Sequence, residues 1–237
     1  ALMRVGGRRL TASRVGFLFK SYIESRRVTV NTWDNTAALM SAKDLIVDEL
    51  TVIPRKTGAA TIPIQNRERD VIDCKGFNLR FAINNGATTN AVCMRLAVIS
   101  PIDKNALSVV DFFRGYDGNR GKAFTSNTDA SELLWNPINR DNHVVLWEKK
   151  IMLGPGFDSS VSSTNLYFSR TSDSFTTFQT YVKLNRQLRY SGEDADTCTD
   201  KVFLVAWYDY PNGNASATPP AATLSYKRFG VTHWKDP

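Results

Sequence analysis

Histidine is scarce in this chain of 237 residues, with only His143 and His233, and the patterns that carry enzyme chemistry are missing. A metal site built on histidines needs them clustered, so two isolated ones predict structural roles and no bound metal. The sequence also lacks a P-loop, a GxGxxG turn, a GxSxG elbow and an HExxH motif. We therefore expect a protein that is not an enzyme and uses no cofactor, while paired carboxylates keep a β-sandwich hydrolase as one alternative.

Cysteine and long apolar segments are also sparse. Cys74, Cys93 and Cys198 are odd in number and widely spaced, which argues against a disulfide framework or a zinc knuckle and predicts buried, reduced thiols. No run approaches the 18 apolar residues of a membrane-spanning helix, and the first residues lack the apolar core of a secretory signal peptide. The sequence thus predicts no membrane insertion.

Acidic residues are nearly missing from one segment, residues 3–27, which reads MRVGGRRLTASRVGFLFKSYIESRR. It has seven basic side chains and a single acid, Glu24, and so carries +6 of the net charge of +7. The rest of the chain, with 23 basic and 22 acidic side chains, is almost neutral. Residues 1–27 are therefore predicted to form a basic arm, and residues 28–237 a separate, nearly neutral domain.

An amphipathic helix is expected inside this arm. Thr11 or Ser13 is placed to cap its start, and the two glycines upstream favour a flexible tail. A basic helix of this kind can bind phosphates, lie on a membrane surface or pack on its own domain, and the charge asymmetry favours nucleic acid. The apolar residues at helical spacing are Val15, Leu18, Phe19, Tyr22 and Ile23.

Eight residues are the candidate nucleic-acid ligands. Clustered Lys and Arg side chains displace counterions from phosphates and raise affinity without reading base sequence. An aromatic ring beside them can stack on an unpaired base, although core packing is the alternative for such a ring. The basic candidates are Arg4, Arg8, Arg9, Arg14, Lys20, Arg26 and Arg27, and the aromatic candidate is Trp33.

Beyond the arm, the dominant signal is the period-two alternation of β-strands. Residues 202–208, VFLVAWY, are apolar on both faces, as in central strands covered on both sides by a core, a loop or a neighbouring subunit. Short helical pieces are expected around 108–113 and 130–135. We predict an all-β fold, a single eight-stranded antiparallel jelly-roll sandwich behind the N-terminal basic arm and its short helix. The expected strands are 26–33, 45–53, 77–83, 92–99, 143–147, 180–190, 202–208 and 224–234.

Two groups of residues in the predicted domain have two interpretations each. The polar strand faces of Asn78 with Arg80, and of Lys183 with Asn185 and Arg189, fit either a phosphate-facing wall or an ordinary solvated sheet. Five aromatic residues outside the clear strands fit either subunit interfaces or covers at the ends of the sandwich. They are Phe112, Phe113, Trp135, Phe157 and Tyr167.

Three parts of the sequence carry a family resemblance. NPINRDNHVVLWEKKIML, residues 136–153, resembles capsid proteins of circular Rep-encoding single-stranded DNA viruses, in which a polar turn leads into a strand. YVKLNRQLRYSG, residues 181–192, followed by KVFLVAWYDYPNG, residues 201–213, resembles their late strand pair. RERDVIDCKGFNLRFAI, residues 67–83, resembles the strand-entry segment shared with geminivirus-like and satellite plant-virus coat proteins.

This resemblance implies a virion protein whose copies assemble into a small icosahedral T=1 shell around a single-stranded genome, with DNA favoured over RNA. The arm would face inward and neutralise the genome. It would also serve in nuclear import, which implies host import factors, a host receptor and assembly in the host nucleus. The alternative from a different class is a non-viral, lectin-like module whose exposed aromatic residues stack on sugars.

Overall fold

The structure is a computed structural model, and it describes residues 4–5, 8–9, 27–31, 38–55, 66–85, 91–103, 107–115, 121–125, 130–154, 174–191, 198–211 and 224–235. Residues 4–5, 8–9, 27–31, 38 and 130–131 are described by their backbone alone. The elements are β1 (Arg4–Val5), β2 (Arg8–Arg9), β3 (Arg27–Asn31), β4 (Ala38–Met40), β5 (Ile46–Glu49), β6 (Val71–Asn84), β7 (Val92–Pro101), α2 (Ala130–Trp135), β8 (His143–Leu153), β9 (Phe175–Arg189), β10 (Phe203–Asp209) and β11 (Leu224–Lys235).

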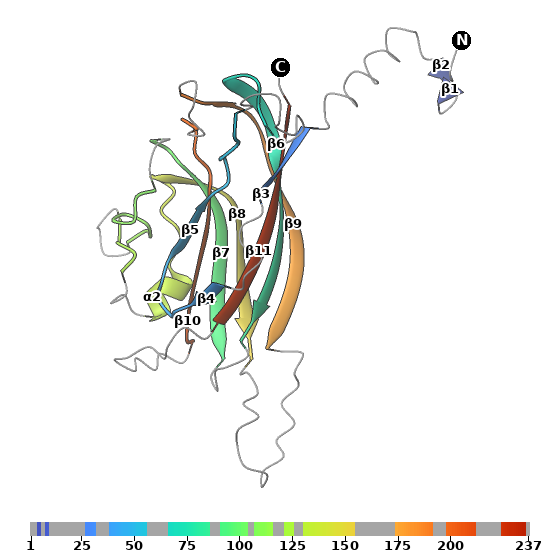
Figure 1. Cartoon of the computed structure of the whole chain (residues 1–237). Helices are drawn as coiled ribbons and strands as arrows, with labels where there is room; N and C mark the ends of the chain where they lie inside the picture. Colours follow the sequence, from blue (N-terminus) through green and yellow to red (C-terminus); the bar gives the residue numbers. More distant parts are fainter. Residues whose placement is uncertain are drawn as a thin grey trace.

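Two antiparallel sheets packed face to face form the body of the molecule (Figure 1). One sheet has the strand order β5-β10-β7-β8 and the other has the order β3-β11-β6-β9. β4 pairs with residues 224–226 of β11 and β3 pairs with residues 230–234, so these two form one interrupted edge strand. Counted in this way, eight strands make two four-stranded sheets in the arrangement of a jelly roll, and the predicted fold class is confirmed.

The alternation in the sequence places one row of each sheet in the core between the sheets. In β6 and β9, Phe77 lies opposite Val182 and Phe81 opposite Phe178, and all four belong to or pack against this core. The Phe81 ring stacks on that of Phe178, with centroids 4.9 Å apart. Each buried side chain of this size stabilises the fold by about 1.5–3 kcal/mol. The apolar rows seen in the sequence are therefore what joins the two sheets.

Arg186 interrupts the apolar row of β9, and the structure shows how it is accommodated. Its guanidinium crosses to the other sheet, where it donates to the hydroxyl of Ser100 in β7 (2.8 Å) and to the main-chain carbonyl of Asp200 (3.5 Å). Polar groups inside a sandwich are tolerated when they are hydrogen-bonded. Arg186 thus acts as a polar cross-link between the sheets.

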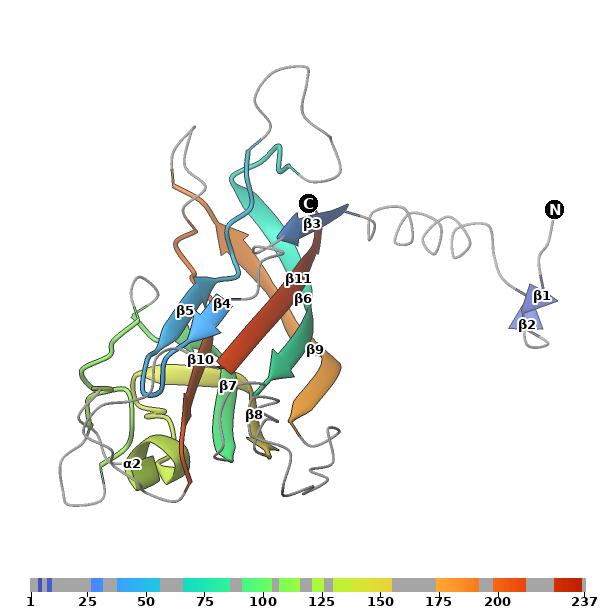
Figure 2. The ribbon, with the colours of Figure 1, turned by 60° about the horizontal axis from the view of Figure 1, so that its bottom comes forward.

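A second core lies on the outer face of the β5-β10-β7-β8 sheet. Residues 107–115, 121–125 and 130–138, here called the cover segment, bring Phe112, Phe113 and Leu133 onto Ile99 and Trp207. Figure 2 shows α2, part of this segment, beside β10. Because the cover segment packs over the two central strands of this face, β7 and β10 are buried along their whole length, as the apolar runs predicted.

One buried arginine ties the cover segment to the sheet. Arg95 of β7 donates to the main-chain carbonyls of Leu133 (3.0 Å) and Asn136 (2.7 Å) and pairs with Glu148 of β8 (2.5 Å). Its guanidinium lies 4.8 Å from the ring centroid of Trp207, whose indole N–H also donates to Leu133 (2.8 Å). These contacts hold α2 and the turn after it against β7 and β10.

The structure of the cover segment tests the two predicted short helices and shows where three of the five aromatic residues outside the clear strands lie. The helix at 130–135 is confirmed as α2, but 108–113 is not helical, because Phe113 exchanges main-chain hydrogen bonds with Lys122. Phe112 and Phe113 cover their own sheet, while Trp135 is 74% exposed. Phe157 and Tyr167 lie outside the described residues. No helix in the described part of the chain is long and apolar enough to cross a membrane.

The three cysteines are unpaired and buried, as predicted. Burial raises the pKa of Cys74 to about 12, and it also raises the pKa of Cys93 and of Cys198. A thiol in an unfolded chain has a pKa of about 8.5. The stability that depends on the neutral Cys74 thiol is therefore present below about pH 8.5 and is lost as the pH rises toward the folded pKa.

We expect the free energy of unfolding to fall between about pH 8 and pH 10 in the wild type, and to fall less in Cys74→Ala, because this substitution removes the thiol whose pKa is raised to about 12. Urea unfolding at both pH values measures the effect. As a control, the native wild-type protein should react slowly with a thiol reagent at about pH 8, and the urea-unfolded protein should react at all three cysteines. An identical pH slope in wild type and variant would contradict the assignment.

Candidate nucleic-acid interface

The structure places some of the predicted arm residues and leaves others out. β1 pairs with β2, and Arg4 lies opposite Arg9 while Val5 lies opposite Arg8, so three arginines come together in one short ladder. Arg27 is the first residue of β3 and pairs with Trp234 of β11, which places the end of the arm on the edge of a sheet. The predicted helix and the candidates Arg14, Lys20, Arg26 and Trp33 lie outside the described residues.

Basic side chains gather on the outer face of the β3-β11-β6-β9 sheet, here called the basic face. Every second side chain of β9 is exposed, and along β6 and β11 the outward side chains, which alternate with buried ones, are half-buried or exposed. The register places the outward residues side by side, so that Arg80 of β6 lies between Gln179 of β9 and Phe229 of β11. The described outward charges are the basic Lys75, Arg80, Lys183, Arg189, Lys227 and Lys235 and the acidic Asp73.

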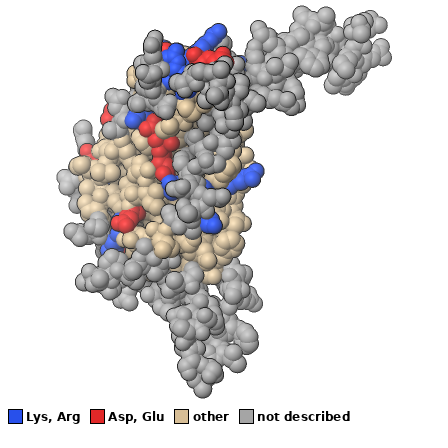
Figure 3. All heavy atoms as spheres, viewed as in Figure 1, with Lys and Arg blue, Asp and Glu red and all other residues tan. Residues whose placement is uncertain are grey.

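Little of this positive charge is neutralised within the face itself. Lys235 and Asp73 lie opposite each other, with 4.0 Å between the ammonium nitrogen and a carboxylate oxygen. Arg80, Lys183 and Lys227 form no ion pair with another residue in the described part of the chain. Figure 3 shows blue side chains projecting at the margin of the body where β9 and β11 lie in Figure 1. Unpaired cations on an exposed sheet are suited to bind a polyanion.

The two outer faces of the sandwich differ in what covers them. The cover segment packs a second core over β7 and β10 on the outer face of the β5-β10-β7-β8 sheet, while Val47 of β5 and Met152 of β8 stay exposed. On β9, by contrast, all the outward side chains are exposed. In the described part of the chain, β9 thus lies on an exposed sheet face, and its outward charges, Lys183 and Arg189, are basic.

An aromatic pair lies within the basic face. Tyr181 of β9 is 53% exposed, and its ring meets that of His233 of β11 with centroids 5.9 Å apart and planes at 62°. Gly76 of β6 lies between the two strands, in a bulge, with φ of 155°. A Cβ at Gly76 would lie 2.9 Å from the Tyr181 hydroxyl oxygen and 3.0 Å from Cζ. The missing side chain thus lets the Tyr181 ring extend across β6.

Both members of this pair are uncharged near neutral pH. Burial raises the pKa of the Tyr181 hydroxyl above its ordinary value of about 10, and the nearby Cys74 adds to the shift. Burial also lowers the pKa of His233. The centre of the basic face is therefore a neutral aromatic surface, with Lys183 on the neighbouring outward position of β9.

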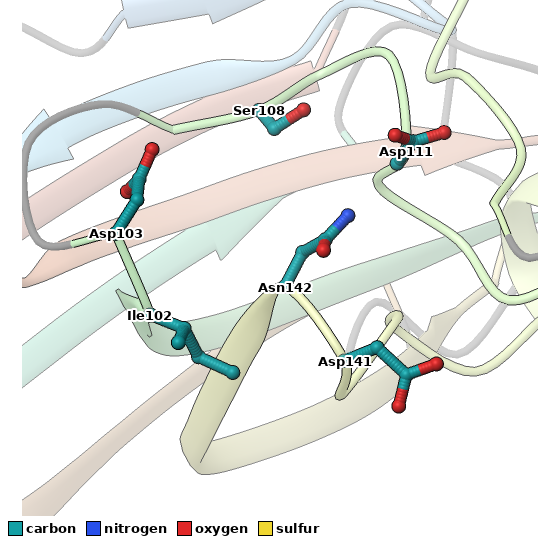
Figure 4. A pocket seen from close by; sticks show the side chains of 6 residues that line it. All are labelled: Ile102, Asp103, Ser108, Asp111, Asp141 and Asn142. Carbon is teal, nitrogen blue, oxygen red and sulfur yellow. The ribbon is translucent and has the colours of Figure 1, made fainter.

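Away from the basic face, a hollow of about 410 Å³ lies beside the end of β7 and the turn before β8. None of its lining residues is basic. Figure 4 shows the carboxylates of Asp103, Asp111 and Asp141 pointing in different directions around it. In the described part of the chain, no group of three or more His, Cys, Asp or Glu residues is placed to hold a metal ion. The hollow is lined by Ile102, Asp103, Ser108, Asp111, Asp141 and Asn142.

His143 is buried close to the aromatic residues of the cover segment. Its Nδ1 donates to the main-chain carbonyl of Asn139 (3.2 Å), and its ring lies 5.7 Å from that of Phe112. Burial lowers the pKa of His143, so the neutral imidazole is favoured. These contacts fit the structural role predicted for this residue.

Sequence reasoning identified some of the residues on the basic face and missed others. Arg80, Lys183 and Arg189 were found as polar positions in alternating strands, and the register brings them onto one face. Tyr181 and His233 were missed as a pair, because their contact depends on two registers and on the bulge at Gly76. The period-two pattern of β9 was the available signal, since it places Tyr181 in the same outward row as Lys183.

Comparison of the sequence with protein-family models and with curated protein sequences gave no match. A function can therefore be argued only from the fold, the exposed surfaces and the charges of the chain itself. Two features serve this purpose: the exposed basic face, and the positive charge that the sequence places in residues 3–27, whose last residue begins β3.

Proposed function

We propose that the chain is a viral capsid protein that binds a packaged single-stranded genome. The observation that carries the proposal is the distribution of positive charge. Residues 3–27 hold +6 of the net +7, and this segment ends at Arg27 in the sheet whose outer face is basic. Arg27 thus joins the end of this segment to the sheet that carries the basic face, and both can contact phosphates of one polyanion. The resemblance of residues 136–153, 181–192 and 201–213 to capsid proteins of single-stranded DNA viruses favours DNA over RNA.

Assembly into a small icosahedral shell is the second part of the proposal. A jelly-roll sandwich whose two outer faces are covered to different extents has two distinct sides, as a shell subunit requires. Exposed apolar side chains supply candidate contacts between copies, because monomeric proteins rarely expose extended apolar patches. Those with the highest exposed fractions among the described residues are Leu39, Val110, Trp135 and Met152. Localisation in the virion, and in the host nucleus during assembly, follows from the same proposal.

Negative-stain electron microscopy of the purified full-length protein tests assembly. We expect shell-sized particles that copurify with nucleic acid and therefore show a raised ratio of absorbance at 260 to that at 280 nm. A stable monomer at neutral pH and high concentration would contradict the capsid proposal. A small oligomer with sugar affinity and no nucleic acid would favour the lectin-like alternative, for which the exposed Trp135 is the candidate sugar contact.

Deleting residues 1–26, which leaves β3 intact, is expected to remove most of the salt-dependent affinity for single-stranded oligonucleotides. The deletion removes six basic side chains and Glu24. Each phosphate contact adds about 0.7 to the slope of log affinity against log salt, so full engagement predicts a slope that is less steep by up to about 4. Fluorescence anisotropy at several salt concentrations measures the slope.

A matched variant with glutamine at Arg4, Arg8 and Arg9 keeps the chain length and removes three of these charges. Its slope should be less steep than that of the wild type by about 2. Circular dichroism should show unchanged β structure in both variants, because the sandwich begins at β3. Binding that survives the deletion with an unchanged slope would show that the arm is not the main contact.

A further inference from the structure

We infer that Tyr181 is a base-stacking residue at the centre of the basic face, so that this face binds nucleic acid with unpaired, exposed bases. The inference rests on the proposed function and deepens it, because it adds a residue that contacts bases to the phosphate contacts. It concerns a residue outside the arm, in the sandwich itself. The geometry of three neighbouring strands carries the argument.

The first step is the position of the Tyr181 ring. Its hydroxyl end lies over Gly76 of β6, so close that a Cβ at Gly76 would be only 2.9 Å from the hydroxyl oxygen. The ring also touches His233 of β11 at a centroid distance of 5.9 Å. One side of the ring is thus held against the sheet while 53% of the residue remains exposed. A ring fixed in this way loses little conformational freedom when a base stacks on it.

The second step is the charge around the ring. Lys183 is the next outward residue of β9 and lies opposite Gly76, while Arg80 lies on β6 two positions from Asn78, the cross-strand partner of Tyr181. Lys75, the half-exposed residue before Gly76, belongs to the same bulge. Neutral aromatic surface flanked by cations is the pattern of proteins that bind single strands, in which the bases stack and the phosphates pair with Lys or Arg.

The third step is the comparison with a duplex. In a duplex the bases are stacked on each other, so an aromatic ring on a sheet cannot reach a base face without disrupting the helix. The cations of the basic face would attract a duplex and a single strand alike. Tyr181 would therefore contribute to binding of a single strand and not to binding of a duplex of equal charge.

The decisive experiment compares two oligonucleotides of about 16 nucleotides, one of thymidine and one in which every nucleotide is abasic but every phosphate is kept. The full-length protein is used at a concentration where light scattering detects no particles. We expect wild type to bind the thymidine oligonucleotide more tightly. Tyr181→Ala should reduce affinity for it on the order of 10-fold, with little effect on the abasic one and with an unchanged salt slope.

Two variants separate stacking from effects on the fold. Tyr181→Phe keeps the ring and should keep the preference for bases. Gln187→Ala, at another outward position of β9, should leave both affinities unchanged. Circular dichroism and a melting curve establish that each variant is folded before binding is measured.

The outcomes distinguish this inference from the proposed function. If wild type and Tyr181→Ala prefer the thymidine oligonucleotide by the same factor, the stacking role is overturned and binding by the arm stands. If wild type binds neither oligonucleotide in a salt-dependent way, the proposed function is overturned and the inference falls with it. If Tyr181→Phe binds as weakly as Tyr181→Ala, the hydroxyl rather than the ring is responsible, which also overturns stacking.

Discussion

Replacing Arg95 with Met is expected to lower the free energy of unfolding by about 3 kcal/mol, because the buried guanidinium holds the cover segment on the sheet. Met fills much of the same space but donates no hydrogen bonds. The carbonyls of Leu133 and Asn136 lose the Arg95 donor, although Leu133 keeps its bond from Trp207. Glu148 keeps a side chain that is 30% exposed, so water can solvate its carboxylate and limits the cost of losing the ion pair.

Urea unfolding followed by intrinsic fluorescence measures this effect, since Trp207 lies directly under the guanidinium. The matched control is Arg80→Met on the exposed basic face, which should change the free energy of unfolding by no more than about 0.5 kcal/mol. Equal unfolding midpoints for the two variants would mean that Arg95 does not anchor the cover segment.

Gly76→Ala is expected to destabilise the protein by about 3 to 5 kcal/mol. The new Cβ would overlap the main-chain carbonyl oxygen of Val182, which is held in the β6–β9 ladder and cannot turn away. The backbone of Gly76 also has φ of 155°, a conformation that residues with a side chain rarely adopt. Strain and overlap therefore act at the same position.

A thermal melt measures the loss, and amide hydrogen exchange should show faster exchange along β6 and β9 than along β7 and β10. Asn78→Ala is the control, because Asn78 lies on the same strand and in the same outward row. That substitution removes one exposed hydrogen bond from Gln179 (2.9 Å) and should cost about 1 kcal/mol or less. A Gly76→Ala variant as stable as Asn78→Ala would contradict the overlap argument.

The strands could be predicted from the sequence because their alternation is local. Phe77, Leu79 and Phe81 mark one face without any knowledge of their partners, so 77–83 was predicted as a strand. β6 nevertheless begins at Val71, because Lys75 and Gly76 break the alternation at the bulge and hide its first part. The cover segment was harder, since the position of Phe112 and Phe113 depends on bonds to Lys122 and on the distant Arg95 and Trp207.

The residues of the candidate site also fall into those with a local signal in the sequence and those without one. Charge counting along the chain predicts the arm, and this stays a prediction, because Arg14, Lys20, Arg26 and Trp33 lie outside the described residues. Charges on alternating positions predicted part of the basic face. Lys227 and Lys235 join that face only through the pairing of β11 with β6, which links residues about 150 positions apart in the chain and has no local signature.

The cover segment and the basic face lie on opposite sides of the sandwich, with the main core between them. Packed sheets are about 10 Å apart, so residues such as Arg95 and Tyr181 have no neighbours in common. Energetic effects at sites this far apart are independent of each other to within about 0.5 kcal/mol. Substitutions on the basic face can therefore leave the stability supplied by the cover segment unchanged, which gives the two surfaces separate evolutionary freedom.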